Sequence, residues 1–120
     1  MAALLVVEDD DVQRKMLGML LSKHFDVTLC DQFTAMDYDW RLFDAVLLDV
    51  LMPVHNGPEL VRWAAERYES LPKVVFYSAL PAELLAKEAT ALAGVVPLYY
   101  IVKSGSPTNL VEILKALCES

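Results

Sequence analysis

The feature that most constrains the fold is an apolar run near the middle of the chain. Residues 45–48 are all apolar, and they lead directly into a carboxylate, Asp49, which is followed by Pro53 and the turn pair Asn56-Gly57. A short apolar run bounded by turn residues is typical of a strand that is buried on both faces of a parallel sheet. The sequence therefore predicts a central strand that presents Asp49 at its C-terminal end, the edge where ligands and chemistry sit in open α/β sheets.

Four further apolar stretches have the length of a strand, and helical patterns separate them. The expected strands are 4–7, 26–30, 74–78 and 98–102. The expected helices cover about 12–23, a short segment within 32–40, the residues after Gly57, a segment opened by Pro81, and a last segment capped by Ser106-Pro107. Five strands alternating with five helices predict an α/β fold, a doubly wound five-stranded parallel sheet.

Helical periodicity also predicts which side chains of the outer helices face the core. In the first helix the apolar residues that recur on one face are Val12, Met16, Met19 and Leu20. In the last helix the expected inner face consists of Leu110, Ile113, Leu114 and Leu117.

Composition narrows the class of protein. A chain of 120 residues is long enough for one domain with a real core, so we expect a single domain over 1–120. Its net charge of −7 argues against direct binding to nucleic acid, because the phosphate backbone would repel it. No apolar run reaches membrane-spanning length, and the N-terminus lacks the basic start of a signal peptide, which predicts a cytoplasmic protein that does not bind membranes. Cys30 and Cys118 have neither metal-ligand nor redox spacing and are expected to be reduced thiols.

Polar residues stand at the ends of four of the expected strands. Glu8-Asp9 follow the first strand, Asp49 the third, Ser78 ends the fourth, and Lys103 follows the fifth. Carboxylates gathered at one edge repel one another unless a cation lies among them, and Mg²⁺ suits a site of carboxylates, a carbonyl and waters. Lys103 and the Ser78 hydroxyl would then be able to hold the oxygens of a phosphoryl group carried on Asp49, with this carboxylate as the nucleophile.

Each of these positions, taken alone, also has a purely structural interpretation. Glu8-Asp9 can cap a helix, Asp49 can end a strand in a turn, Ser78 can be a turn hydroxyl, Lys103 can be solvated, and Tyr100 can belong to the core. Their coincidence at one sheet edge is what favours the functional interpretation.

The chain resembles a response-regulator receiver domain of two-component signalling, the CheY-like family, over essentially its whole length. The matching segments are Val6-Val7-Glu8-Asp9, the run 47–53 with Gly57 after it, Phe76-Tyr77-Ser78-Ala79, and Tyr100-Ile101-Val102-Lys103. The resemblance implies a flavodoxin-like sheet with the strand order 2-1-3-4-5.

The resemblance also implies a role for each site residue. Asp49 would be the phosphoacceptor, taking a phosphoryl group from a histidine kinase or a histidine phosphotransfer protein in a phosphorelay. The Mg²⁺ cofactor would be held by Glu8, Asp9 and Asp49 with the backbone carbonyl of Leu51. Ser78 and Lys103 would contact the phosphoryl group, so that catalysis is limited to the domain's own phosphorylation and dephosphorylation.

The family pattern further implies a switch and an output surface. Tyr100 would report the state of Ser78, and the surface of the fourth helix, fifth strand and fifth helix would carry the signal to a downstream protein or linked output domain. One departure from the family pattern is that Ser104-Gly105 follow Lys103 where the family has proline in a cis peptide, so we expect a trans bond or a strained exception. This departure keeps one alternative open, a pseudo-receiver that acts as a phosphorylation-independent interaction module.

Overall fold

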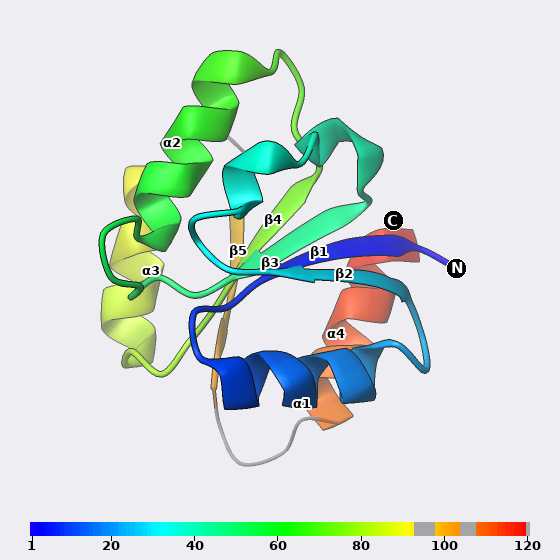
Figure 1. The fold of residues 1–120 in the computed structure, drawn as a ribbon. Coiled ribbons are helices and arrows are strands. Elements are labelled where there is room, and N and C mark those ends of the chain that lie inside the picture. Colours follow the sequence, from blue (N-terminus) through cyan, green and yellow to red (C-terminus); the bar gives the residue numbers. More distant parts are fainter. Residues whose placement is uncertain (93–97, 104–107, 120) are drawn as a thin grey trace.

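Five parallel strands form one twisted sheet in the order β2-β1-β3-β4-β5 (Figure 1). The computed structural model describes residues 1–92, 98–103 and 108–119. The strands are β1 (Ala3–Val7), β2 (Asp26–Cys30), β3 (Ala45–Leu48), β4 (Lys73–Ser78) and β5 (Leu98–Val102). All five predicted strands are therefore confirmed, as is the strand order that the family resemblance implied.

The sheet is built around β1 and β3, which pair with each other in parallel register from Leu4 opposite Ala45 to Val7 opposite Leu48. Every residue of β3 is buried, as expected for a strand covered on both faces. Since the two strands run in register, their C-terminal ends bring Glu8 and Asp49 to the same edge of the sheet.

Helices cover both faces of this sheet. The helices α1 (Asp11–Leu21) and α4 (Thr108–Glu119) lie on one face, and α2 (Gly57–Arg67) and α3 (Ala82–Ala91) lie on the other (Figure 1). Alternate residues of each strand point to opposite faces, so neighbouring strand residues enter different cores. In β1, for example, Leu4 packs with α1 and α4, whereas Leu5 packs with α2 and α3.

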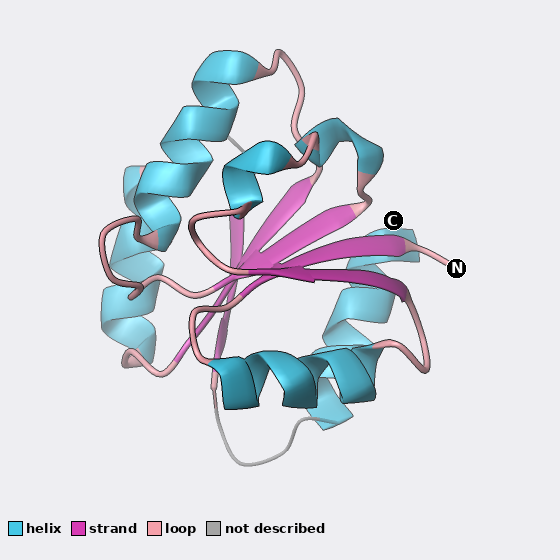
Figure 2. Ribbon diagram, in the orientation of Figure 1, coloured by secondary structure: helices cyan, strands magenta, loops and turns pink. Residues whose placement is uncertain are grey.

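The prediction of five helices is wrong, because the described residues contain four α-helices. Between β2 and β3 the chain forms two short 3₁₀ turns, η1 (Ala35–Asp37) and η2 (Trp40–Leu42), in place of a helix (Figure 2). Trp40 is fully buried, and its indole Nε1 donates to the Ala35 carbonyl at 3.1 Å. One large side chain therefore fills the space that a helix face would otherwise fill, and the connection needs no regular helix.

The predicted inner face of the first helix is wrong for three of its four residues. Val12, Met16 and Met19 are exposed, and only Leu20 packs, partly buried, against the core, whereas Leu17 and Leu21 are buried. Apolar residues occur all round α1, so periodicity alone did not decide between its two faces. In α4, Leu110 and Leu114 are buried as predicted and Leu117 is partly buried, but Ile113 is 40% exposed. The predicted cap at Ser106-Pro107 lies outside the described residues.

Neither cysteine forms a disulfide in the described part of the chain. Cys30 and Cys118 are free, and burial, with the nearby Asp31 charge, raises the pKa of the Cys30 thiol to about 12. No helix in the described part of the chain combines the length and the hydropathy that a membrane crossing requires.

Candidate functional site

The ammonium group of Lys103 lies at the centre of the C-terminal edge of the sheet. Its Nζ donates to Asp49 Oδ2 at 2.9 Å, to Gln13 Oε1 at 2.7 Å and to Glu8 Oε2 at 3.3 Å. The backbone of Lys103 is fixed as well, since its N–H donates to the Ser78 carbonyl at 2.7 Å. Lysine has three N–H donors, so this geometry uses all of them. The residues that directly follow β1, β3 and β5 are thus joined to the first turn of α1 through one cation.

Burial changes the protonation properties of this cluster. Burial raises the pKa of the Glu8 carboxyl, and the positive charge of Lys103 opposes that rise only in part. Burial alone would lower the pKa of the Lys103 ammonium, but its hydrogen bonds and charge contacts with Asp49 and Glu8 outweigh that effect, and the pKa is raised. Lys103 is therefore held as a cation.

The residue that caps the first helix is Asp10, and not Glu8 or Asp9. Asp10 is the N-cap of α1, and its side chain accepts from the Val12 N–H at 2.9 Å. Glu8 instead faces Lys103, and a side-chain hydrogen bond with Asp9 contributes to its raised pKa. The acidic pair is thus part of the same edge as Asp49 and Lys103.

The remaining predicted site residues surround this cluster at different depths. Ser78 is buried at the end of β4, and its hydroxyl oxygen accepts from the Leu80 N–H at 3.4 Å. Leu51 is exposed, and its N–H donates to Asp49 Oδ1 at 3.2 Å. Tyr100 on β5 is 45% exposed, so it does not belong to the core. The Lys103-Ser104 peptide lies outside the described residues.

The donors at this edge suit a hard cation. Within the described ranges, no group of three or more histidine, cysteine, aspartate or glutamate side chains is arranged to hold a metal ion. Two carboxylates, those of Glu8 and Asp49, nevertheless already converge on the single positive charge of Lys103. Carboxylate oxygens supplemented by a carbonyl and waters are what Mg²⁺ prefers, so the chemistry of the donor set fits this ion.

Comparison with known proteins gives the family. The model of the response regulator receiver domain matches residues 4–115. The chain belongs to this family. It is 41% identical to the 3′,5′-cyclic-nucleotide phosphodiesterase regA of Dictyostelium discoideum over 64 residues, which cover 49% of this chain and 8% of that protein. The chain therefore matches only a small part of the curated relative's length.

Solved receiver structures share the fold. The non-phosphorylated HemR receiver domain from Leptospira biflexa superimposes with a TM-score of 0.83 at 21% identity, over 100% of this chain and 96% of that one. The response regulator TrrA from Thermotoga maritima, solved in complex with Mg²⁺-BeF, gives a TM-score of 0.76 at 22% identity, over 98% of this chain and 99% of that one. At these identities the likeness shows the fold alone.

Two residues of this receiver domain that touch the site were not predicted from the sequence. Gln13 accepts from Lys103 Nζ, and Arg14 Nη1 donates to the Glu8 backbone carbonyl at 2.8 Å. Both lie in the first turn of α1, five and six residues after Glu8. The signal available in the sequence was their position directly after the acidic strand end, where a helix brings its first turn back to that edge.

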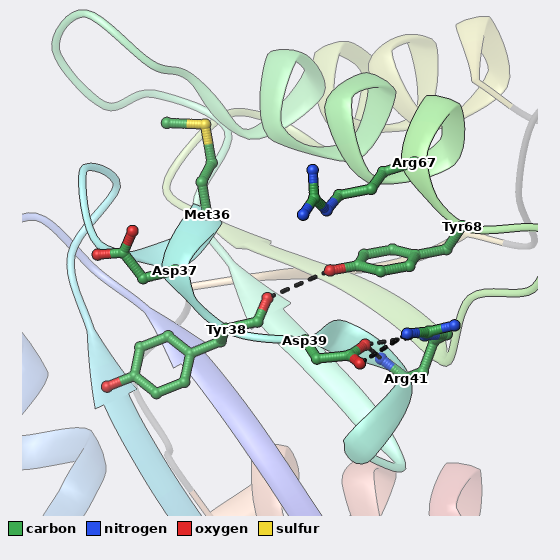
Figure 3. Close-up of a pocket in the computed structure, with 7 residues that line it drawn as sticks. All are labelled: Met36, Asp37, Tyr38, Asp39, Arg41, Arg67 and Tyr68. Carbon is green, nitrogen blue, oxygen red and sulfur yellow. Dashed lines mark hydrogen bonds and ion pairs between the residues drawn. The ribbon is translucent and has the colours of Figure 1, made fainter.

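The receiver domain has a second polar hollow that contains none of the predicted site residues. It has a volume of about 390 Å³ and lies between η1, η2 and the C-terminal end of α2 (Figure 3). The Arg41 guanidinium forms two hydrogen bonds with the Asp39 carboxylate there, and its central carbon lies over the Tyr68 ring, 4.9 Å from the ring centroid. Since η2 leads into the start of β3, this hollow is at the opposite edge from Asp49.

Proposed function

We propose that this receiver domain accepts a phosphoryl group on Asp49 from the phosphohistidine of a histidine kinase or a histidine phosphotransfer protein. The observation that carries the proposal is the position of Lys103, whose ammonium is hydrogen-bonded to Asp49 and shared with the buried Glu8. A half-buried lysine held against the acceptor carboxylate is placed to stabilise the charge of a phosphoryl group there.

The chemistry follows from this arrangement. A carboxylate oxygen of Asp49 attacks the phosphorus atom, the P–N bond to the donor imidazole breaks, and the electron pair leaves with the histidine nitrogen. Lys103 then exchanges its contact with Asp49 for an oxygen of the phosphoryl group and keeps the Gln13 contact. Mg²⁺, when bound by Glu8, Asp9, Asp49 and the Leu51 carbonyl, would neutralise the charge that gathers on the phosphoryl oxygens. The TrrA structure in complex with Mg²⁺-BeF supports this assignment by family membership.

The response to phosphorylation is a shift between two conformations. Ser78 is buried beside the site, whereas Tyr100 is 45% exposed, as expected for a chain without a phosphoryl group. In our proposal the Ser78 hydroxyl turns toward the phosphoryl group and Tyr100 moves inward. The surface of α3, β5 and α4, which are the expected fourth helix, fifth strand and fifth helix, then changes its affinity for a downstream target. A modification shifts such an equilibrium only by its differential contacts with the two states.

The proposal covers residues 1–120 as one domain in the cytoplasm, without a separate substrate to turn over. The similarity to regA does not extend a phosphodiesterase activity to this chain, because only 8% of that protein is matched. The partner kinase, or a phosphotransfer protein, supplies the histidine, and the output protein is contacted through α3, β5 and α4.

The test is phosphorylation by a small donor. The chain is incubated with acetyl phosphate and MgCl₂, and its intact mass is measured for the wild type, for Asp49→Asn and for the exposed control Asp37→Asn. We expect the wild type and Asp37→Asn to gain the mass of one phosphoryl group and Asp49→Asn to gain none. A wild type that stays unmodified, and that does not bind beryllofluoride, would contradict the proposal and favour the pseudo-receiver.

A further inference from the structure

The loop that follows Asp49 contains a strained turn. Val54 has a φ of 67°, and the His55 N–H donates to the Pro53 carbonyl at 2.8 Å, which closes a three-residue turn around Val54. A positive φ is unfavourable for a β-branched residue, and such conformations persist only where the surroundings hold them. The question is what holds this one.

A buried glutamine from another part of the chain contacts the same carbonyl. Gln32 is 3% exposed, and its Nε2 donates to the Pro53 oxygen at 3.1 Å. Its other amide atom, Oε1, is buried and has no hydrogen-bond partner among the described residues. Burial of an unpaired amide oxygen is unfavourable, so the folded chain tolerates a cost to place the Nε2 donor at this point.

The segment that carries Gln32 is itself fixed. Asp31 Oδ1 accepts from the backbone N–H groups of Phe33 and Thr34, both at 2.9 Å. The Phe33 ring packs edge-on against the His55 ring, with their centroids 5.7 Å apart. Two consecutive residues, Gln32 and Phe33, therefore brace the two ends of the turn at Val54.

The braced turn is connected to the phosphoacceptor. Leu51 donates its N–H to Asp49 Oδ1, and Pro53 is two residues further along the same loop. At the far end of the loop the Gly57 N–H donates to the Val50 carbonyl at 2.9 Å, so the loop is closed at its base. Between these points the contact of Gln32 is the side-chain hydrogen bond that fixes the loop from outside.

We propose that Gln32 is a positioning residue for the phosphorylation site, holding the Pro53 carbonyl and thereby the loop whose Leu51 carbonyl would be a ligand of Mg²⁺ in the proposed function. This inference rests on the proposed function of Asp49, and it adds a role for a residue that contacts neither the phosphoryl group nor the ion. Gln32 acts through the turn at Val54, which fixes the loop at a cost in stability.

The test is Gln32→Leu, which removes the donor and the unpaired oxygen together while keeping the size of the side chain similar. We expect the urea midpoint to stay equal or to rise, because the buried Oε1 is removed. We expect hydrogen exchange at the His55 amide to accelerate roughly 3- to 10-fold, the change that loss of one hydrogen bond produces. The affinity for Mg²⁺, measured by titration calorimetry, is expected to fall by a similar factor.

A second variant relates the effect to the turn. Val54→Gly relieves the positive φ, so Gln32→Leu made in that background is expected to change His55 exchange less than it does in the wild type. Equal changes in both backgrounds would show that Gln32 does not act through the turn, and would overturn the proposal.

The outcomes separate this inference from the proposed function. If the wild type is phosphorylated but Gln32→Leu leaves both His55 exchange and Mg²⁺ affinity unchanged, the inference is wrong and the function stands. If the urea midpoint of Gln32→Leu falls while His55 exchange is unchanged, Gln32 is an ordinary core residue and the inference is again wrong. If the wild type neither binds Mg²⁺ nor accepts a phosphoryl group, the proposed function fails, and so does the role of Gln32 that rests on it.

Discussion

The molecule carries a charged cluster at each edge of its sheet, and the two differ in how far they are removed from water. At the C-terminal edge, the side chains of Lys103, Glu8 and Asp49 are only 16%, 4% and 12% exposed. At the opposite edge, Arg41 and Asp39 are 60% and 34% exposed (Figure 3). The Arg41 pair has good bidentate geometry, yet water and salt screen it, whereas the Lys103 cluster is held by elements distant in sequence.

The comparison shows that geometry alone does not identify a functional ion pair. Asp39 and Arg41 are two residues apart and meet within one turn, so their pairing does not depend on the tertiary structure. Glu8, Asp49 and Lys103 are separated in sequence by 41 to 95 positions and meet only when β1, β3 and β5 are assembled. Burying a charge is unfavourable unless its partners compensate, so this second kind of cluster depends on the assembled fold, as the proposed phosphorylation site requires.

The largest loss of stability is expected for Lys103→Met. Removing the cation leaves two buried carboxylates without their partner, and we expect the free energy of unfolding at pH 7 to fall by about 3 kcal/mol. The measurement is urea denaturation of the variant and the wild type. A loss no larger than that of a surface substitution would mean that the Lys103 cluster is as screened as the Arg41 pair.

The same variant has a pH dependence whose sign is fixed by Glu8. The pKa of Glu8 is raised in the folded chain by burial, so folding favours its protonated form and stability falls as the pH rises from the unfolded to the folded pKa. Without the charge of Lys103 this pKa rises further. The difference in stability between Lys103→Met and the wild type is therefore expected to shrink on acidification. In the wild type, the contribution from the raised pKa of Lys103 is lost only above the pKa of an unfolded lysine, about 10.4.

A smaller effect is expected for Gly57→Ala, at the base of the loop after Asp49. A Cβ on Gly57 would lie 2.3 Å from the Asp49 carbonyl oxygen and 3.1 Å from the Val50 Cα, so the backbone itself would have to move. We expect the free energy of unfolding, measured by urea denaturation, to fall by about 2 kcal/mol, as for an overpacked core. Phosphorylation by acetyl phosphate is expected to be slower as well.

The matched control for that substitution is Gly18→Ala in α1. There the added Cβ would meet the end of the partly exposed Leu29 side chain, which is able to turn away. Because alanine has a higher helix propensity than glycine, we expect Gly18→Ala to leave the free energy of unfolding unchanged or to raise it. A large loss at Gly18 would show that crowding, and not the closeness of the Asp49 backbone, governs both positions.

The smallest effect is expected for Arg41→Met in the second hollow. Its pair with Asp39 is local and solvated, so we expect an unchanged urea midpoint and unchanged phosphorylation. The Arg41 hydrogen bonds and charge lower the pKa of Asp39, so NMR titration is expected to show the pKa of that carboxyl rising in the variant. A clear loss of stability would show that the Arg41 pair, like the Lys103 cluster, contributes to the stability of the fold.

The parts of this fold that sequence patterns predict well are those in which one physical signal dominates. The apolar run Ala45–Leu48 has no alternative to burial, and each strand end at Glu8, Asp49, Ser78 and Lys103 lies where parallel topology puts it. The inner face of α1 was not predictable from periodicity, because methionines on one side and leucines on the other give competing apolar stripes. The 3₁₀ turns depend on Trp40 filling a space that only the assembled core defines.

The contacts that complete the site were beyond the sequence for a related reason. Gln13 and Gln32 are neutral polar residues that belong to no sequence motif. Each forms a hydrogen bond with a residue far along the chain, Gln13 with Lys103 and Gln32 with Pro53. No local spacing encodes such a pair. Strain at Val54 is likewise a property of the closed loop and not of the residue, since valine ordinarily favours extended backbone.

The position of Lys103 just after β5 has a consequence for biosynthesis. Of the five strands, β5 is the last to leave the ribosome, and it joins the sheet beside β4 at the side farthest from β2. A nascent chain that has made only the first four strands would hold the two acidic strand ends without their counter-charge. In the proposed function, such a chain would also lack the cation that contacts the phosphoryl group, so phosphorylation of Asp49 would depend on the last strand having joined the sheet.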